Sequence, residues 1–292
     1  MDIHGVLASA LLAATGLAPA SGGDVVRWHV PGVSSAAWES HPAIDPRTHD
    51  LWFVRSDSDF SGWQLMWSRC LPQGWSAPAP APIAANEGIE ADPWFSADGT
   101  ALYFISSRAS GSRESAGLDI WFASRDAQGD WGPPTRLPEP VNSPHAEWFP
   151  RPDADGWLYF GSRRPGGLGN DDIWRARRTA TGRWQVENAG PAINSPGAEY
   201  EFQPAASGRW ALLATDDGLF RVERGADGWK PRVRLDATVN ATGTEIGPML
   251  SPDGTAFAFS RDAGDGRSGE FYLARSGNAP AWPRCAAQAS HR

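Results

Sequence analysis

The chain has 292 residues, of which 41% are hydrophobic and 21% are charged, a balance that supports a packed core and excludes global disorder. Its formal net charge is −8, without a basic run, which excludes nucleic-acid binding through phosphate neutralisation. The 16 tryptophans, 32 glycines and 25 prolines indicate many turns between short strands, with aromatic side chains available to pack between sheets.

Residues 1–20 are predicted to be a signal peptide. The stretch VLASALLAATGLA is short and apolar, and Ala18-Pro19-Ala20 has the form of a small-x-small cleavage site. The chain starts with MDIH, which lacks the Lys or Arg typical of such peptides. We nevertheless expect export, and therefore a periplasmic or secreted bacterial protein. No later apolar run reaches the length of a membrane span, so we expect a soluble monomer without one.

A four-residue motif, Glu-x-x-Pro, occurs five times at intervals of 44 to 57 residues. The copies read ESHP, EADP, EWFP, EFQP and EIGP, and they begin at Glu39, Glu90, Glu147, Glu201 and Glu245. A near-regular period of this length is typical of repeat architectures, in which each repeat is one supersecondary unit.

Each copy of the motif is followed by the same succession of elements. A turn comes first, and four of the five turns contain Asp-Gly or Ser-Gly, where Gly allows a positive φ. An alternating apolar run follows, then a variable loop and a third run; the third runs read QLMWS, DIWFAS, DIWRAR, GLFRVE and EFYLAR. A further turn leads to a tryptophan in every segment, namely Trp75, Trp131, Trp184, Trp229 and Trp282. These are strand-length runs without helical periodicity.

Four short strands per segment predict an all-β fold, a β-propeller of five blades with four antiparallel strands each. Only ten residues follow Trp282, too few for the outer strand of the last blade. The segment DVVRWHV near the N-terminus is therefore expected to supply that strand and close the ring. The propeller domain is expected to span residues 24–285, with a C-terminal tail at 286–292, and six blades remain the alternative.

Three stretches resemble the TolB-type (WD40-like) β-propeller repeat: SPDGTAFAFSRD, SADGTALYFISSR and LYFGSRRPGGLGNDDIWRARR. The resemblance extends from about Val25 to Trp282. It implies a protein of the bacterial envelope that acts as a protein-interaction module in the periplasm.

The repeated glutamates each precede the first strand of a blade, which lines the central channel in a propeller. They could form a channel rim that binds a cation or a partner's Arg or Lys. Alternatively, each could join its blade to the next through backbone N–H groups or an arginine. Candidate arginines follow the second strand in four blades: Arg55, Arg108, Arg163 and Arg261. Repetition in every blade favours the joining role, because a binding site needs asymmetry.

We expect no metal site, no cofactor and no catalytic residues. The histidines lack metal-ligand spacing, and the acidic loop around Asp171 and Asp172 does not offer the spacing of a calcium loop. Binding to an envelope protein is the favoured function. The alternative is a carbohydrate-binding propeller, or a glycosidase that uses a pair of channel carboxylates about 5–9.5 Å apart.

The two cysteines, Cys70 and Cys285, are predicted to form a disulfide. Export places them in an oxidising compartment, where a pair of cysteines is usually bridged. Cys70 follows the third strand of the first blade and Cys285 follows Trp282 in the last. Because these two blades are neighbours in a closed ring, the bridge would lie at its seam. Two free thiols remain the alternative.

Overall fold

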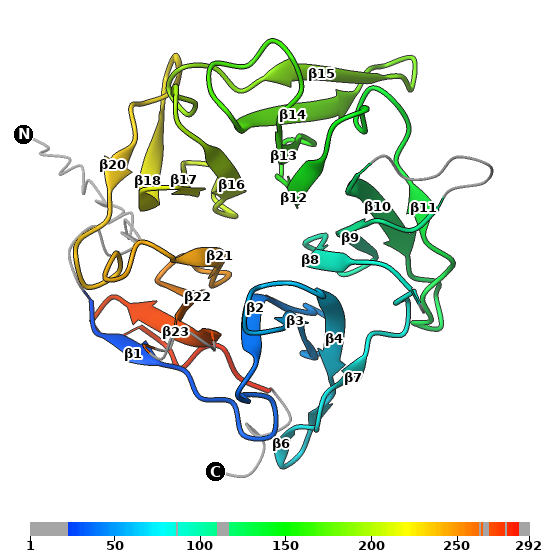
Figure 1. Cartoon of the computed structure of the whole chain (residues 1–292), viewed down its shortest axis with the longest axis vertical. Coiled ribbons are helices and arrows are strands. Elements are labelled where there is room, and N and C mark those ends of the chain that lie inside the picture. The colour runs from blue at the N-terminus through cyan, green and yellow to red at the C-terminus, as the bar shows by residue number, and fades with distance from the viewer. Residues whose placement is uncertain are drawn as a thin grey trace, which may run out of the picture.

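The computed structural model describes residues 23–85, 87–109, 117–262, 264, 269–277 and 279–285. These residues form strands and turns without an α-helix, and among them no helix is long and apolar enough to cross a membrane. The predicted signal peptide at 1–20 and the tail at 286–292 lie outside the described residues. The fold is all-β and propeller-like, with antiparallel sheets arranged around a common centre (Figure 1).

The strands form successive antiparallel groups, which we number in chain order. Group 1 contains β2 (Trp38–Ile44), β3 (Leu51–Ser56), β4 (Gln64–Ser68) and β7 (Ala79–Pro80). Group 2 contains β8 (Glu90–Phe95), β9 (Ala101–Ser106), β10 (Asp119–Ser124) and β11 (Thr135–Arg136). Group 3 contains β12 (Glu147–Pro152), β13 (Leu158–Ser162), β14 (Asp172–Arg178) and β15 (Trp184–Asn188).

The remaining strands follow the same plan. Group 4 contains β16 (Glu199–Pro204), β17 (Trp210–Thr215), β18 (Gly218–Gly225) and β20 (Val233–Arg234), and the short β19 (Gly228–Trp229) pairs with the end of β18. Group 5 contains β21 (Ile246–Leu250), β22 (Ala256–Asp262), β23 (Gly269–Arg275) and β1 (Val25–Arg27). A two-stranded hairpin, β5 (Cys70–Leu71) with β6 (Gly74–Trp75), extends group 1.

The first strand of each group lies nearest the centre in Figure 1, and a β-bulge interrupts it. In four of these strands the third residue of Glu-x-x-Pro has a positive φ: His41, Asp92, Phe149 and Gly247. The following proline lies in the interrupted part of the ladder, where no backbone N–H is needed for pairing. The motif is therefore the sequence of a bulge.

Group 4 departs from this geometry. The prediction that Glu201 is equivalent to the other repeated glutamates was wrong. In β16 the ladder shifts between Glu199 and Glu201, and Glu199 pairs with Thr215 as Glu147 pairs with Ser162 in group 3. Glu199 is thus the equivalent of the other glutamates. The letters EFQP begin two residues later, because this bulge is shorter and contains no proline.

Neighbouring groups bury apolar side chains between them. Groups 2 and 3, for example, enclose Ile105, Ile120, Leu158, Phe160 and Trp174 in one cluster. Complete burial of a side chain of this size contributes about 1.5–3 kcal/mol. Since each sheet has a neighbour on both faces, it can be apolar on both faces.

Group 5 and group 1 meet where the ends of the described chain come together. As predicted, the N-terminal strand β1 pairs antiparallel with β23. Its Arg27 binds Glu270 at 2.9 Å, and Ser34 donates to the same carboxylate at 2.8 Å. Trp38 of β2 forms a parallel bridge to Gly269 of β23. A Cβ on Gly269 would lie 2.0 Å from the Trp38 ring, so glycine is required for this approach.

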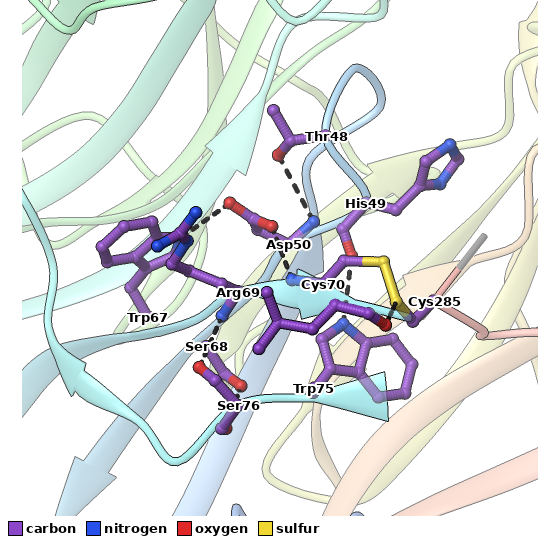
Figure 2. The surroundings of a disulfide bond; sticks show 11 residues. Thr48, His49, Asp50, Trp67, Ser68, Arg69, Cys70, Trp75, Ser76 and Cys285 are labelled. Carbon is purple, nitrogen blue, oxygen red and sulfur yellow. Dashed lines mark hydrogen bonds between the residues drawn. A yellow bond between two sulfur atoms is a disulfide. The ribbon is translucent and has the colours of Figure 1, made fainter. Parts of the chain in front are cut away.

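The predicted disulfide between Cys70 and Cys285 is confirmed (Figure 2). Its Cα atoms lie 5.3 Å apart, and 215 residues separate the two cysteines in the sequence. Around it, the Cys70 N–H donates to Asp50 at 2.7 Å, and the Trp75 indole N–H donates to the His49 carbonyl at 3.0 Å. The bond therefore ties the chain beyond β23 to a well-bonded hairpin of group 1.

Candidate functional site

The repeated glutamates are buried and bind the segment that leads into their own group. Glu39, Glu147 and Glu199 are each 0% exposed. Each accepts hydrogen bonds from the backbone N–H and the hydroxyl of a serine four residues earlier: Ser35, Ser143 and Ser195. The recurring stretches SAAWE, SPHAE and SPGAE carried this signal in the sequence. The same stretches would have identified Glu199.

The other two glutamates have similar contacts without the serine. Glu90 accepts from the Ala85 N–H at 2.8 Å. Glu245 accepts from the N–H groups of Ala241 and Thr242, at 3.0 and 2.8 Å. All these carboxylates thus hold backbone donors in place instead of facing solvent.

Each glutamate also binds an arginine. Arg55 lies directly across the ladder from Glu39, with an Nε–Oε1 distance of 2.8 Å. Arg261 of β22 binds Glu245 in the same way, with an Nε–Oε1 distance of 3.1 Å. Arg108 binds Glu90. The same guanidinium groups donate to carbonyls of the linking segment before each group, as Arg55 does to Val33 at 2.7 Å.

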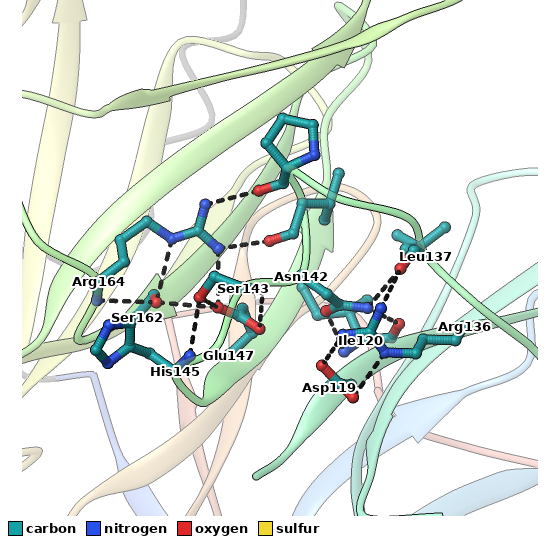
Figure 3. Close-up of polar contacts among 12 residues, drawn as sticks. Asp119, Ile120, Arg136, Leu137, Asn142, Ser143, His145, Glu147, Ser162 and Arg164 are labelled. Carbon is teal, nitrogen blue, oxygen red and sulfur yellow. Dashed lines mark hydrogen bonds and ion pairs between the residues drawn. The ribbon is translucent and has the colours of Figure 1, made fainter. Parts of the chain in front are cut away.

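In group 3 the arginine that binds Glu147 is Arg164, not the predicted Arg163. Ser162 lies opposite Glu147, and Arg164 lies two residues later on the same face (Figure 3), with a 2.8 Å contact to the carboxylate. Arg163 points to the other face, because alternate residues of an extended chain do so, and it binds Asp171 at 3.0 Å. In group 4, Arg232 of the β19–β20 connection binds Glu199.

Replacing Arg164 with Gln is therefore expected to lower the free energy of unfolding by about 2–3 kcal/mol, because Glu147 would lose a charged partner away from water. The melting temperature should fall by several degrees. The adjacent Arg163→Gln is the matched control: its side chain is 64% exposed, against 9% for Arg164. Solvent screens the charge of Arg163 in its pair with the buried Asp171, so a smaller loss is expected. Thermal unfolding of both variants tests the assignment, which equal losses would refute.

A second set of repeated polar residues was missed in the sequence. Three buried asparagines each bind one residue of a third strand, through both the backbone N–H and the backbone carbonyl of that residue. They are Asn142, Asn194 and Asn240. Asn142, for example, accepts from the Ile120 N–H at 2.7 Å and donates to the Ile120 carbonyl at 2.9 Å (Figure 3). The signal was the recurrence of VNS, INS and VNA before the glutamates.

The bulges of the first strands bring a set of buried polar groups together, which we call the central cluster: His41, Asp92, Arg151 and Glu201. Arg151 binds Glu201 and lies 4.3 Å over the Trp94 ring. Asp92 accepts from the Phe149 N–H at 3.2 Å, and its carboxylate lies 3.9 Å from the His41 imidazole.

Burial dominates the protonation of the central cluster. It raises the pKa of Asp92 to about 8, against the opposing charge of Arg151. It also raises the pKa of Glu201, which Arg151 again opposes. Burial, reinforced by the Arg151 charge, lowers the pKa of His41 to about 3. Perturbed groups of this kind are candidates for catalysis.

The adjoining space is too small for a substrate. A cavity beside His41 and Asp92 has a volume of about 20 Å³ and is closed by Phe60, Trp63 and Phe149. That is room for about one water molecule. Among the described residues no group of His, Cys, Asp and Glu could hold a metal ion.

Asp92 is expected to make the stability of the protein depend on pH. Its carboxyl group is charged in the unfolded chain above the ordinary aspartate pKa of 3.8 but stays neutral in the folded protein up to about pH 8. The stability that it contributes is thus fully present below pH 3.8 and is lost as the pH rises through 8. Asp92→Asn should abolish this loss. Urea unfolding of both proteins between pH 4 and 8 checks it, and a constant difference in stability would contradict it.

A groove of about 820 Å³ lies between groups 2 and 3, and we call it the lateral groove. Its apolar lining includes Tyr103, Phe122 and Leu137. Its charged lining consists of Arg177, Arg178 and Asp155, and Arg224 binds Asp155 at 2.8 Å. The volume lies in the range of small-molecule and peptide-side-chain sites, about 300–1,000 Å³. Nothing in the repeat pattern predicted it.

Comparison with known proteins gives similarities of fold. No family model matches the chain, and no curated protein matches it. Among solved structures, an α-L-arabinofuranosidase from Lactobacillus brevis is 12% identical, with a TM-score of 0.47 over 85% of this chain and 92% of that one. A PQQ-bound aldose sugar dehydrogenase from Streptomyces coelicolor is 13% identical, with a TM-score of 0.45 over 89% and 100%.

An oligogalacturonate lyase from Vibrio parahaemolyticus is 10% identical, with a TM-score of 0.39 over 88% of this chain and 99% of that one. The chain also matches a prolyl endopeptidase, of which it spans only 29%. At identities this low the similarities concern the course of the backbone alone, and activity does not transfer with them.

Proposed function

We propose that this protein is an exported five-bladed propeller of the TolB type that binds a protein partner in the bacterial envelope. Groups 1 to 5 correspond to the five blades, with β1 as the fourth strand of the last; the β1–β23 ladder supports five blades over six. The disulfide supports a periplasmic or secreted location, because disulfides persist in oxidising compartments.

One observation favours binding over catalysis: the carboxylates around the channel are already engaged. The repeated glutamates, now Glu39, Glu90, Glu147, Glu199 and Glu245, are at most 3% exposed and bind backbone N–H groups and arginines. In this proposal they join the blades. A glycosidase needs two carboxylates that reach the scissile bond, whereas Asp92 and Glu201 are 2% and 1% exposed.

Capture from an envelope extract tests the proposal. The tagged protein, carrying a photo-crosslinker, should enrich a defined protein, and an excess of the untagged protein should compete with it. In parallel, a panel of plant and bacterial polysaccharides should not be hydrolysed. Hydrolysis that Glu201→Gln abolishes would overturn the proposal in favour of a glycosidase, and binding to a glycan alone would favour a carbohydrate-binding propeller.

A further inference from the structure

An arginine recurs near the end of the third strand in three of the groups, and its contacts differ from one boundary between groups to the next. Arg125, Arg178 and Arg224 occupy this position in groups 2, 3 and 4. Each guanidinium lies over the tryptophan of its own group, at 4.1 Å from Trp131, 4.8 Å from Trp184 and 5.5 Å from Trp229 respectively. The three arginines therefore start from the same local arrangement.

Two of these arginines close a boundary by binding an acid of the preceding group. Arg125 binds Asp45, in the turn after β2. Arg224 binds Asp155, in the turn after β12, at 2.8 Å. In both cases the ion pair spans the space between two sheets, where a ligand could otherwise enter.

The boundary between groups 2 and 3 lacks this closure. The corresponding turn of group 2 has Ser96 where group 1 has Asp45, and its Asp98 is used within the turn. Asp98 accepts from Ser96 Oγ at 2.6 Å and from the Thr100 N–H at 3.0 Å. Arg178 instead donates to the Gly182 carbonyl of its own turn at 3.2 Å. The lateral groove lies at this unclosed boundary.

Two exposed cations therefore face the lateral groove without an acidic partner. Arg177 lies 4.3 Å over the Trp157 ring, and neither Arg177 nor Arg178 binds a carboxylate among the described residues. The stacked tryptophans fix the planes of the guanidinium groups, which leaves N–H donors for an incoming anion. Beside them, Tyr103, Phe122 and Leu137 provide an apolar surface.

We propose that the lateral groove binds an acidic peptide segment of a protein partner. A carboxylate would bind Arg178 and Arg177, replacing the acid that closes the neighbouring boundaries, and an adjacent apolar side chain would cover Phe122 and Leu137. A peptide supplies a carboxylate and an apolar side chain on adjacent residues, which matches two arginines beside Phe122 and Leu137. This inference rests on the proposed binding function and names the chemistry of its ligand.

An array of synthetic hexapeptides tests the proposal with the whole protein. Peptides with Asp or Glu beside Leu or Phe should bind, whereas matched peptides with Asn or Gln should bind at least tenfold more weakly. For the best peptide, fluorescence anisotropy should show that Arg178→Gln lowers affinity about tenfold, as expected when one charge-assisted hydrogen-bonded contact is lost. Arg177→Gln should lower it several-fold.

Arg209→Gln is the control, since Arg209 is exposed before β17 of group 4 and does not line the groove, so this change should leave peptide affinity unchanged. The groove assignment would be overturned if no peptide binds or if the neutral peptides bind equally well. It would also be overturned if Arg178→Gln leaves affinity unchanged or if oligogalacturonate binds more tightly than the peptides. If extract capture succeeds and Arg178→Gln does not weaken it, the binding function stands and this site is wrong. If peptides bind while capture fails, the groove assignment stands and the envelope partner is wrong.

Discussion

Replacing Cys70 and Cys285 together by serine is expected to lower the free energy of unfolding by about 4–5 kcal/mol. A cross-link that closes a loop of 215 residues restricts the unfolded chain. The loop-entropy relation gives about 5.4 kcal/mol for so long a loop, an upper value because structure in the unfolded chain reduces the loss. In the folded protein the effect should be local, because the β5–β6 hairpin keeps its ladder and the bonds of Cys70 and Trp75 to the preceding turn.

Urea unfolding measures the loss, with the slope of the transition recorded as well as its midpoint. The wild-type protein in a reducing agent should reproduce the behaviour of the double variant, because both lack the cross-link. An unchanged midpoint in the double variant would show that the ring of sheets holds the two ends together without the bond.

Arg151→Met is expected to destabilise the protein by about 3–5 kcal/mol. The residue is 1% exposed and binds Glu201, which is equally buried. Removing one member of a buried ion pair leaves the other charge without compensation. Glu201 would then fold only in its neutral form, so the loss should grow as the pH rises above the ordinary pKa of a glutamate, about 4.3.

The double variant Arg151→Met with Glu201→Gln provides the control. It removes both charges, so it should be more stable than Arg151→Met alone and should lack the additional pH dependence. The ion pair of Arg224 and Asp155 gives the comparison at the surface, since its side chains are 36% and 57% exposed. Arg224→Gln should lower the free energy of unfolding by no more than about 1 kcal/mol. Equal stability of the single and double variants across pH would show that the buried pair is not coupled.

The sequence by itself determined the all-β repeat, the pairing of the N-terminal strand and the disulfide. These follow from local signals: turn dipeptides, alternating apolar runs and two cysteines at the ends of neighbouring repeats. The positions of Glu39, Glu90, Glu147 and Glu245 were also predictable, because the bulge that follows them needs a proline and a residue of positive φ at fixed spacing.

The tertiary structure alone decided which side chains meet. Arg163 and Arg164 differ by one residue in the sequence but lie on opposite faces, so only the register of β12 against β13 selects Arg164 for Glu147. Glu201 was misplaced because a bulge one residue shorter moves the whole ladder of β16.

The central cluster and the lateral groove depend still more on the assembled ring. Arg151 and Glu201 lie 50 residues apart and on different sheets, and no local pattern relates them. The lateral groove lies at a boundary where Arg178 binds no acid of the preceding group, because Asp98, at the position of Asp155, is bonded within its own turn. A single repeat does not reveal this difference. Local sequence specifies the strands and turns of each repeat, whereas contacts between repeats depend on how the sheets pack around the axis.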